Sequence, residues 1–489
     1  MNTSLLKPYK LDWSALVHET PEWFRDAKFG LFFHLGPYVV PGFENEWYSR
    51  NMYNKELSQS KYHIKTYGKL SEFGYKDFYD QFTVNNFDPE AWTDLIVLSG
   101  ARYAGPVSEH SDNFSMWDSA VNPVNSVNYG PHRDIVGELK QSITGRGLKF
   151  AATFHHQWLW GWFMSTDPDA DVYDPANEKY YWKALPLEAN RFIPWRLPDN
   201  EFNQMWLARI KEVIDKYNPD LVYLDSRTTV IEERVRMEML EYCYHGPSGR
   251  SDRAVTYKQE DFPDGTAVAD VERGRFPGVQ DFVWQTDDRL EDCITWCHVK
   301  NTRYRSDTSV IHQLIDTVSK NGNLLLNVGP KADGTFDKAA VRALKGIGTW
   351  MNRYGEAIYE TRPFMVHGEG AEDSGNSGFD MTHIEAQTKT GLEKLDSNKI
   401  VSPGDIRYTK KDDIIYAIIP FSRDHTEFSF SSLGRRCSGS RFSIHNVDSI
   451  NSTGKITWQR NEESLMVKST VGLPDAHANV IRIHTVPRG

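Results

Sequence analysis

Asp220-Leu-Val-Tyr-Leu-Asp-Ser-Arg227 directly follows the dipeptide Asn218-Pro219, which ends a helical run. The order of helix, turn, short apolar segment and carboxylate predicts one β-strand of an α/β barrel, with Asp225 at its carboxyl end. Because barrel enzymes keep their reactive groups at this end of the strands, Asp225 is our candidate nucleophile. The same carboxylate could instead only cap the helix expected over residues 228–245.

The same alternation of strand and helix runs through the first three quarters of the chain. Strands are expected at residues 29–36, 101–107, 148–156, 254–258, 268–271, 282–287 and 323–328, and helices at residues 21–28, 89–99, 134–143, 202–217, 310–320 and 338–354. Such alternation predicts a (β/α)8-like barrel catalytic domain, which we assign to residues 1–365. The polar segment 165–190 is expected to form a loop over the barrel mouth.

Helical periodicity disappears from about residue 366. Three apolar or alternating runs, Ile414–Ile419, Arg441–Ile444 and Val480–His484, are separated by clusters of Gly, Ser, Asp and Asn. This pattern of short strand-like runs and turn-forming clusters predicts a C-terminal antiparallel β-sandwich over residues 366–489. The expected fold class is therefore α/β, a barrel followed by a sandwich.

Composition restricts the possible partners. The net charge of −11, with no strongly basic stretch, argues against nucleic-acid binding, and no run of about 18 apolar residues predicts a membrane span. Four scattered cysteines predict buried thiols rather than a disulfide framework or a zinc site. The N-terminus lacks the pattern of a signal peptide, so a periplasmic, secreted or lysosome-like location would require a leader that has been removed. The sequence gives no prediction of the oligomeric state.

Aromatic residues make up 13% of the chain, and many lie beside polar groups in its first half, a mixture that suits sugar rings. Histidines end three of the expected strands, whereas a lone histidine at a strand end is usually a core residue. The loop after the first strand adds an acid and an indole at the same rim. The residues concerned are His34, His110, His155 and His156, with Glu46 and Trp47 in the loop.

Glu272 follows the strand expected at residues 268–271 and provides a second carboxylate at the barrel rim. Two such carboxylates, about 5–5.5 Å apart, are what a retaining glycosidase needs. Asp225 would attack the anomeric carbon as an anion, and Glu272 would give its proton to the leaving oxygen. An ion pair between Glu272 and the adjacent Arg273 is the competing interpretation.

Several longer motifs resemble those of the α-L-fucosidases of glycoside hydrolase family 29, and the resemblance covers about residues 20–365. It implies a retaining double displacement on a barrel with a C-terminal β-sandwich, with no metal and no cofactor. The motifs are Phe29-Gly-Leu-Phe-Phe-His-Leu-Gly36, Glu46-Trp-Tyr48, Pro219–Asp225, Gly322-Asn-Leu-Leu-Leu-Asn-Val-Gly-Pro-Lys-Ala-Asp-Gly-Thr335 and Gly355-Glu-Ala-Ile-Tyr359.

The resemblance also implies roles for single residues. Asp225 falls on the family's nucleophile, and Tyr223 stands where an aromatic residue walls the sugar pocket. The family's sugar-binding histidine and Glu-Trp pair correspond to His34, Glu46 and Trp47. Its histidine pair after the second strand is here His110-Ser111, so His155 or His156 is expected to replace the lost contact.

The acid/base departs from the pattern of many family members, which carry it in a Trp-Glu pair. Here that position reads Trp284-Gln285, so Trp284 is retained as a sugar-binding candidate only. Another branch of the family, selective for α-1,3/1,4 linkages, places a glutamate near Val271-Glu-Arg-Gly274, which favours Glu272. The reserve candidates are Glu260, Glu291 and Asp270.

The expected substrate is a fucosylated oligosaccharide or glycoconjugate. Three alternatives stay open at this point. The histidines His34, His110, His155 and His156 could bind the metal of a barrel hydrolase. Gln285 and Ser111 are compatible with an inactive sugar-binding homologue. A related exo-glycosidase acting on an α-L-galactoside would need only room for one more hydroxyl.

Overall fold

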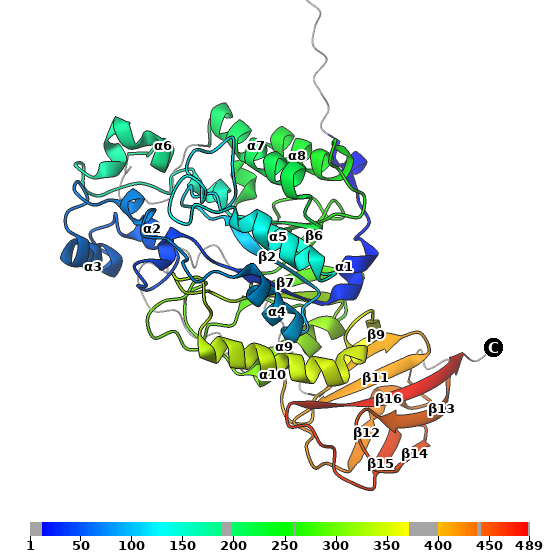
Figure 1. The fold of residues 1–489 in the computed structure, drawn as a ribbon. Coiled ribbons are helices and arrows are strands. Elements are labelled where there is room, and N and C mark those ends of the chain that lie inside the picture. Colours follow the sequence, from blue (N-terminus) through cyan, green and yellow to red (C-terminus); the bar gives the residue numbers. More distant parts are fainter. Residues whose placement is uncertain (1–11, 187–196, 259, 371–399, 438–441, 488–489) are drawn as a thin grey trace, which may run out of the picture.

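The computed structural model describes residues 12–186, 197–258, 260–370, 400–437 and 442–487. Its larger part is a closed barrel of eight parallel strands arranged in chain order (Figure 1), which confirms the predicted fold class. The strands are β1 (Phe29–Phe33), β2 (Tyr103–Glu109), β3 (Lys149–Phe154), β4 (Leu221–Leu224), β5 (Ala254–Lys258), β6 (Val268–Asp270), β7 (Trp284–Arg289) and β8 (Gly322–Asn327).

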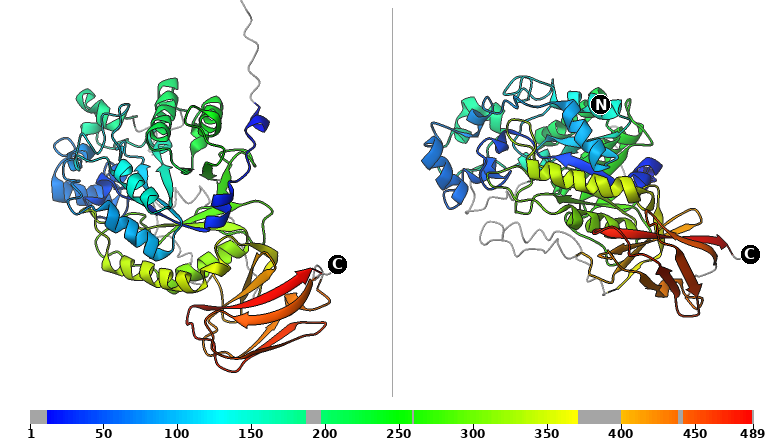
Figure 2. Two further views of the ribbon diagram at one scale, coloured as in Figure 1. Left: turned by 45° about the vertical axis from the view of Figure 1, so that its right-hand side comes forward. Right: turned by 60° about the horizontal axis from the view of Figure 1, so that its bottom comes forward.

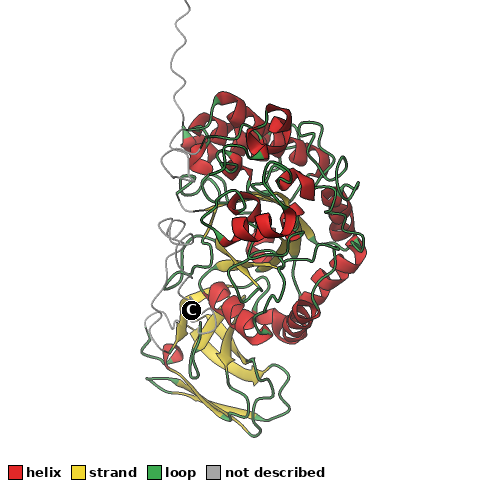
Figure 3. Cartoon of the chain, turned by 90° about the vertical axis from the view of Figure 1, so that its left-hand side faces the viewer, coloured by secondary structure: helices red, strands yellow, loops and turns green. Residues whose placement is uncertain are grey.

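Helices surround the barrel on its outer side (Figure 3), where they bury the apolar outer faces of the strands. The helices of the described residues are α1 (Glu22–Ala27), α2 (Tyr48–Asn51), α3 (Ser58–Tyr67), α4 (Pro89–Ser99), α5 (Ile135–Gly145), α6 (Glu178–Tyr181), α7 (Asn200–Tyr217), α8 (Glu233–His245), α9 (Asp307–Ser319) and α10 (Lys338–Tyr354), of which α2, α3 and α6 belong to the connections after β1 and β3. Local sequence explains the predicted ends: Asp88 caps α4 ahead of Pro89, and Gly100 ends that helix at φ 86°. Among the described residues, none of the helices combines the length and apolar character that crossing a bilayer requires.

Two connections are more ordered than the sequence predicts. The segment expected to be a loop over residues 165–190 contains α6 and two short 3-10 helices, Asp171–Tyr173 and Pro175–Asn177, while residues 187–190 lie outside the described part. Buried tyrosines hold it: the hydroxyl of Tyr53 donates to Asp171 at 2.9 Å. The short helices α2 and α3 follow β1 in a stretch for which no helix is expected.

The C-terminal part contains two antiparallel sheets. One has the order β13-β16-β11-β10-β9 and the other β12-β15-β14. The strands are β9 (Arg362–Glu369), β10 (Ile406–Lys411), β11 (Ile414–Pro420), β12 (Glu427–Phe430), β13 (Phe442–Ser449), β14 (Ile456–Arg460), β15 (Leu465–Ser469) and β16 (Ala478–Pro487). Apolar side chains of both sheets form one buried cluster, as in a sandwich. The expected boundary between residues 365 and 366 falls inside β9, which pairs with β10.

The helices α9 and α10 lie between the barrel and the C-terminal sheets (Figure 2). Asp316 on α9 accepts from Arg407 of β10 at 2.7 Å and from Lys320 at 2.9 Å, and all three side chains are buried. The indole of Trp350 on α10 donates to the carbonyl of Ala478 at 3.0 Å. These contacts fix the second domain against the outer wall of the barrel, away from the pocket described below.

Candidate active site

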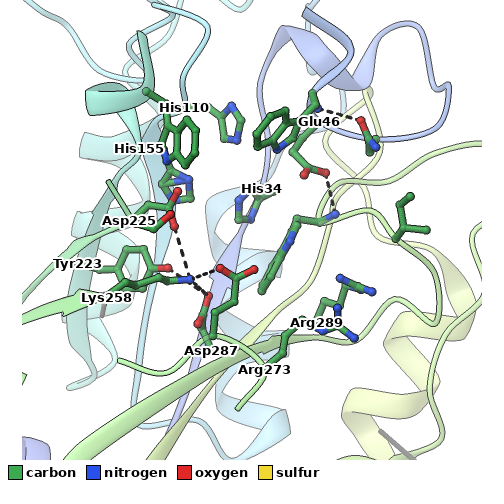
Figure 4. Close-up of a pocket in the computed structure, with 17 residues that line it drawn as sticks. His34, Glu46, His110, His155, Tyr223, Asp225, Lys258, Arg273, Asp287 and Arg289 are labelled. Atoms are coloured by element: carbon green, nitrogen blue, oxygen red, sulfur yellow. Dashed lines mark hydrogen bonds and ion pairs between the residues drawn. The ribbon is translucent and has the colours of Figure 1, made fainter. Parts of the chain in front are cut away.

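A pocket opens at the carboxyl ends of the barrel strands (Figure 4). Strands β1 to β5 and β7 each contribute to its lining a residue that ends the strand or follows it closely, and the segments after β1, β6 and β7 complete the walls. This is the end at which an α/β barrel brings residues that are distant in sequence into contact. Of the predicted site residues, His34, Glu46, Trp47, His110, His155, Tyr223, Asp225 and Glu272 line this pocket.

Asp225 directly follows β4, as predicted. Its backbone N–H donates to the carbonyl of Phe154 at 3.0 Å, and its own carbonyl accepts from Gln157 at 2.6 Å, so the main chain at this residue is held on both sides. The helix α8 has Glu232 at its N-terminal cap, and Asp225 caps neither α8 nor the 3-10 turn before it. The carboxylate of Asp225 therefore points into the pocket instead of serving the helix.

Lys258, the last residue of β5, lies at the centre of the site. Its ammonium contacts Glu272 Oε2 at 2.8 Å, Asp287 Oδ2 at 2.9 Å and Asp225 Oδ1 at 3.5 Å. Burial alone would lower the pKa of Lys258, but the surrounding carboxylates, Asp287 first, raise it well above its usual value. Lys258 is therefore a permanent cation, and sequence reasoning did not select it.

One ammonium with three carboxylates leaves the site with excess negative charge. Burial raises the pKa of Asp225, the ammonium of Lys258 opposes this effect, and the carboxylate of Glu272 raises the pKa further. The carboxyl groups of Asp225 and Glu272 therefore lie close together around one cation, and their mutual repulsion raises the pKa of Asp225.

The separation of Asp225 and Glu272 follows from their shared contact. Because both oxygens contact one nitrogen, at 3.5 and 2.8 Å, they cannot be farther apart than the sum of these two distances. This upper limit, which holds for one oxygen of each carboxyl group, is compatible with the separation of about 5–5.5 Å in retaining glycosidases. Both carboxyl groups line the same pocket.

The reserve candidates for the acid do not line the pocket. Glu260 is exposed, and Glu291 is buried where it accepts from the backbone N–H of Gly329 at 2.7 Å. Asp270 lies lower in the barrel and accepts from the amide of Gln285. Gln285 therefore occupies the barrel interior below the pocket, so it does not mark a lost acid, and the main reason for expecting an inactive homologue disappears.

Three histidines form the floor of the pocket. The ring centroids of His34, His110 and His155 are 5.1 to 5.7 Å apart, and the rings come from the ends of β1, β2 and β3 as predicted. His34 Nδ1–H donates to Asn327 Oδ1 at 2.7 Å, which leaves its Nε2 as an acceptor. Burial lowers the pKa of His34 to about 3, and also keeps the pKa of the other two rings well below its usual value. All three imidazoles are neutral near pH 7.

The neutral rings are compatible with hydroxyl groups or with a metal ion. Each ring offers one nitrogen, and these three nitrogens lie within 4.8 Å of one another, so the cluster is a candidate three-histidine metal site. His110 Nδ1 and His155 Nε2 are buried without a hydrogen-bond partner among the described residues. Buried polar nitrogens of this kind require a partner from a ligand, and a polyhydroxylated sugar supplies several.

Glu46 lies across the pocket from Asp225 (Figure 4), and the next residue, Trp47, also lines the pocket. Glu46 accepts from the backbone N–H of Trp296 at 2.8 Å, and burial raises the pKa of its carboxyl group to about 7. The indole of Trp47 packs against Trp158 and Trp162, with ring centroids 5.6 and 4.9 Å away. These residues form a wall with polar groups set in aromatic surface, a composition that suits a sugar ring.

Two predicted sugar-binding residues are wrong. His156 turns to the opposite side from His155, donates to the carbonyl of Trp206 at 3.1 Å and packs under α7. Trp284 begins β7 rather than ending it, and its indole donates to the carbonyl of Lys320 at 2.9 Å. Both side chains stabilise the barrel outside the pocket. Ser111 also points away and donates to the carbonyl of His155 at 3.3 Å.

Other pocket residues were missed by the sequence analysis. Asp287, Arg289 and Trp296 line the walls, and each belongs to β7 or to the irregular segment that follows it. Asp287 binds Lys258 and accepts from the hydroxyl of Tyr223 at 3.1 Å, so it supports two other pocket residues. Lys258 and Asp287 each end or nearly end an expected strand, which is the signal that selected Asp225.

Comparison with known protein sequences gives a consistent result. A family model described as Alpha-L-fucosidase matches residues 2–356. Tissue alpha-L-fucosidase of Rattus norvegicus is 28% identical over 370 residues, which are 74% of this chain and 74% of that protein. Alpha-L-fucosidase of Dictyostelium discoideum is 29% identical over 366 residues, which are 71% of this chain and 73% of that protein.

Solved structures extend the likeness to the C-terminal sheets. The structure of Thermotoga maritima alpha-fucosidase in complex with a mechanism-based inhibitor matches with a TM-score of 0.73 and 25% identity, covering 97% of this chain and 99% of that one. Alpha-L-fucosidase isoenzyme 1 from Paenibacillus thiaminolyticus matches with a TM-score of 0.68 and 20% identity, covering 95% and 98%. The second of these shows likeness of fold alone.

Proposed function

Because the chain belongs to the α-L-fucosidase family of glycoside hydrolases, we propose that it is a retaining exo-α-L-fucosidase that releases terminal α-linked L-fucose from oligosaccharides or glycoconjugates. The observation that carries this proposal is the single nitrogen of Lys258, which contacts both Asp225 and Glu272. The two oxygens that share this contact are close enough for a double displacement, whereas an inverting enzyme needs room for a water molecule between its carboxyl groups.

In the first step, a carboxylate oxygen of Asp225 forms a bond to the anomeric carbon as the bond from this carbon to the glycosidic oxygen breaks. Glu272 transfers its proton to that oxygen, so the aglycone leaves as a neutral alcohol. The ammonium of Lys258 favours the ionised form of Asp225, which is the form that attacks. The product of this step is a β-L-fucosyl ester on Asp225 and an ionised Glu272.

In the second step, Glu272 removes a proton from a water molecule that attacks the anomeric carbon. The ester bond to Asp225 breaks, its carboxylate is regenerated, and Glu272 is protonated again. The released fucose has the α-configuration of the substrate. Lys258 stays charged throughout and compensates the negative charge as it moves from one carboxyl group to the other.

The remaining pocket residues are suited to hold a fucosyl ring. The neutral rings of His34, His110 and His155, together with Glu46, offer donors and acceptors to the three ring hydroxyls. Trp47 and Trp296 offer aromatic surface to the C–H faces and to the methyl group. Because the pocket is closed below by buried side chains, it fits a terminal sugar and not the interior of a polymer.

Hydrolysis of 4-nitrophenyl α-L-fucoside, followed by NMR from the first minute, tests this proposal. We expect the α-anomer of fucose to appear first and the β-anomer only later, by mutarotation. Glu272→Gln should slow the hydrolysis of a natural fucosylated oligosaccharide far more than that of the aryl fucoside, whose leaving group needs little proton donation. Glu260→Gln, an exposed glutamate near the same rim, is the matched control.

Initial formation of β-fucose would disprove the retaining mechanism, and near-normal turnover of the oligosaccharide by Glu272→Gln would disprove the assignment of the acid. Preferential turnover of the corresponding α-L-galactoside, measured in competition, would replace fucose by the sugar that carries one more hydroxyl. Lack of turnover of both aryl glycosides by the folded protein would contradict the proposed activity itself.

A further inference from the structure

Two arginines line the same pocket as the carboxylate cluster, although neither has a part in the two steps above. Arg289 ends β7, and Arg273 follows Glu272 directly in the segment after β6. Figure 4 shows both on the side of the pocket opposite Asp225. Both side chains keep some exposed surface, 18% in the case of Arg273, and border the pocket space.

The nearby carboxylate does not balance these charges. Asp288 is buried and contacts Arg305 at 2.9 Å and Arg273 at 3.6 Å, and it also accepts from the amide of Gln313 at 3.0 Å. Burial would raise the pKa of Asp288, but Arg305, Arg273 and Arg289 together hold it below its usual value. Three guanidinium groups therefore surround one carboxylate, and this wall is positive in a protein whose net charge is −11.

Other acids in the pocket reduce this excess only in part. Glu46 faces Arg289, but burial raises the pKa of Glu46 to about 7, so it carries only part of a charge near neutral pH. Glu272 and Asp287 form their ion pairs with Lys258, and among the described residues neither lies within ion-pair distance of Arg273 or Arg289. Burial and the charge of Arg273 lower the pKa of Arg289, which is the direction expected of a cation that lacks a full counter-charge.

The backbone at Arg273 supports a functional constraint. Arg273 has a φ of 51°, in the left-handed region that glycine adopts more easily, and yet the arginine and not the adjacent Gly274 takes this conformation. This conformation costs a non-glycine residue about 1 kcal/mol or more, and such residues cluster at functional sites. It is fixed by the backbone N–H of Arg273, which donates to the carbonyl of Asp287 at 2.8 Å. The strained residue is thus the one whose side chain is brought to the pocket wall.

We propose that Arg273 and Arg289 form a subsite for an anionic substituent, a sulfate ester or a carboxylate, on the oligosaccharide that carries the fucosyl residue. This inference rests on the proposed function. Glu272 must face the glycosidic oxygen to donate its proton. Because Arg273 and Arg289 line the same pocket as Glu272, this inference places them beside the sugar on the far side of that bond. Guanidinium groups match the geometry of both anions through paired hydrogen bonds, and a half-buried position strengthens them.

The experiment compares three substrates that share one trisaccharide core: a neutral Lewis-type trisaccharide, and the same trisaccharide with a sulfate ester or a sialic acid at the 3′ position of its galactose. The measured quantity is the ratio of kcat/KM for each anionic form to that for the neutral form. We expect a ratio of about ten or more for at least one anion at low ionic strength, because a charge-assisted hydrogen bond is worth about a tenfold preference or more. The ratio should fall as NaCl is added.

Charge-removing variants locate the subsite. Arg289→Gln and Arg273→Gln should each lower the ratio severalfold, whereas Arg303→Gln should leave it unchanged. Arg303 is an exposed arginine of the segment after β7 that does not line the pocket, so it controls for the loss of one positive charge nearby. The ratio of the unmodified enzyme and its salt dependence test the inference even if a variant does not fold. A preference for only the sulfated or only the sialylated form identifies the source of the anion.

The failures of the two proposals are distinguishable. If 4-nitrophenyl α-L-fucoside is not hydrolysed, the proposed function fails and this inference fails with it. If the aryl fucoside is hydrolysed but the ratio stays near one in the unmodified enzyme, only the anionic subsite is overturned. The same conclusion follows if a high ratio persists in both Arg289→Gln and Arg273→Gln.

Discussion

Replacing Lys258 by Met removes the buried cation that three carboxylates share and keeps much of the side-chain volume. Lys258 lowers the pKa of Asp225, so its loss should raise that pKa and leave the nucleophile protonated at a higher pH than before. The acidic limb of the profile of kcat/KM against pH is therefore expected to move to higher pH.

The size of the effect follows from the contact distance. Two unit charges about 4 Å apart interact by about 4 kcal/mol at an effective dielectric constant of 20, which corresponds to about three powers of ten in rate or equilibrium. The Asp225 contact is 3.5 Å long, and the side chain of Asp225 is 18% exposed, so solvent screens part of the interaction. We expect kcat/KM at pH 6 to fall by about a hundredfold or more.

The assay is the hydrolysis of 4-nitrophenyl α-L-fucoside between pH 4 and 9. Lys258→Arg, which keeps the charge, should retain the position of the acidic limb even if its bulk lowers the rate. Lys28→Met removes another buried lysine outside the pocket and should leave the profile unchanged. If folded Lys258→Met keeps both the rate and the acidic limb of the unmodified enzyme, the electrostatic role of Lys258 is refuted.

Three further outcomes are expected. Burial lowers the pKa of Lys28 from 10.5 to about 7, so the buried ammonium destabilises the fold fully below pH 7, and this destabilisation disappears as the pH rises toward 10.5. Lys28→Met should therefore raise the melting temperature more at pH 6 than at pH 10. A gain that does not depend on pH would contradict this. Asp316→Ala removes the buried carboxylate that both Lys320 and Arg407 contact, so the free energy of unfolding measured in urea should fall by about 3 kcal/mol. A fall of less than about 1 kcal/mol would refute the role of Asp316 in joining the domains. Incubation with EDTA should leave hydrolysis unchanged, whereas a loss of activity that zinc restores would support a metal bound by the three-histidine cluster.

The barrel was predictable because its strands are short apolar runs between helices with clear ends. Three elements begin and end at the residues that the sequence predicts. They are the helices α4 (residues 89–99) and α10 (residues 338–354) and the strand β5 (residues 254–258). The helices α2 and α3 were missed because their sequences have little amphipathic character, and tertiary contacts decide their conformation. The segment with α6 has the polar composition of a loop, and its order depends on hydrogen bonds between tyrosines and Asp171, which sequence periodicity does not reveal.

The pocket was predictable where a functional side chain follows directly on a strand, as with Asp225, His34 and His110. The same rule applied to the charged residue that ends β5 would have found Lys258. His156 could have been excluded, because adjacent residues at a strand end turn to opposite sides. Trp284 was misplaced because β7 continues to Arg289, beyond the expected end of that strand. Trp296 lies in an irregular segment, for which sequence periodicity gives no prediction.

Rescue by azide is the most direct measurement of the central claim that Asp225 is the nucleophile and Glu272 the acid/base. Asp225→Ala and Glu272→Ala should each lose most of their turnover of 4-nitrophenyl α-L-fucoside, and sodium azide should restore it in both. Asp225→Ala is predicted to yield β-fucosyl azide by one displacement, and Glu272→Ala α-fucosyl azide by two. The same anomer from both variants, or rescue of neither although both are folded, would contradict the assignment of this pair.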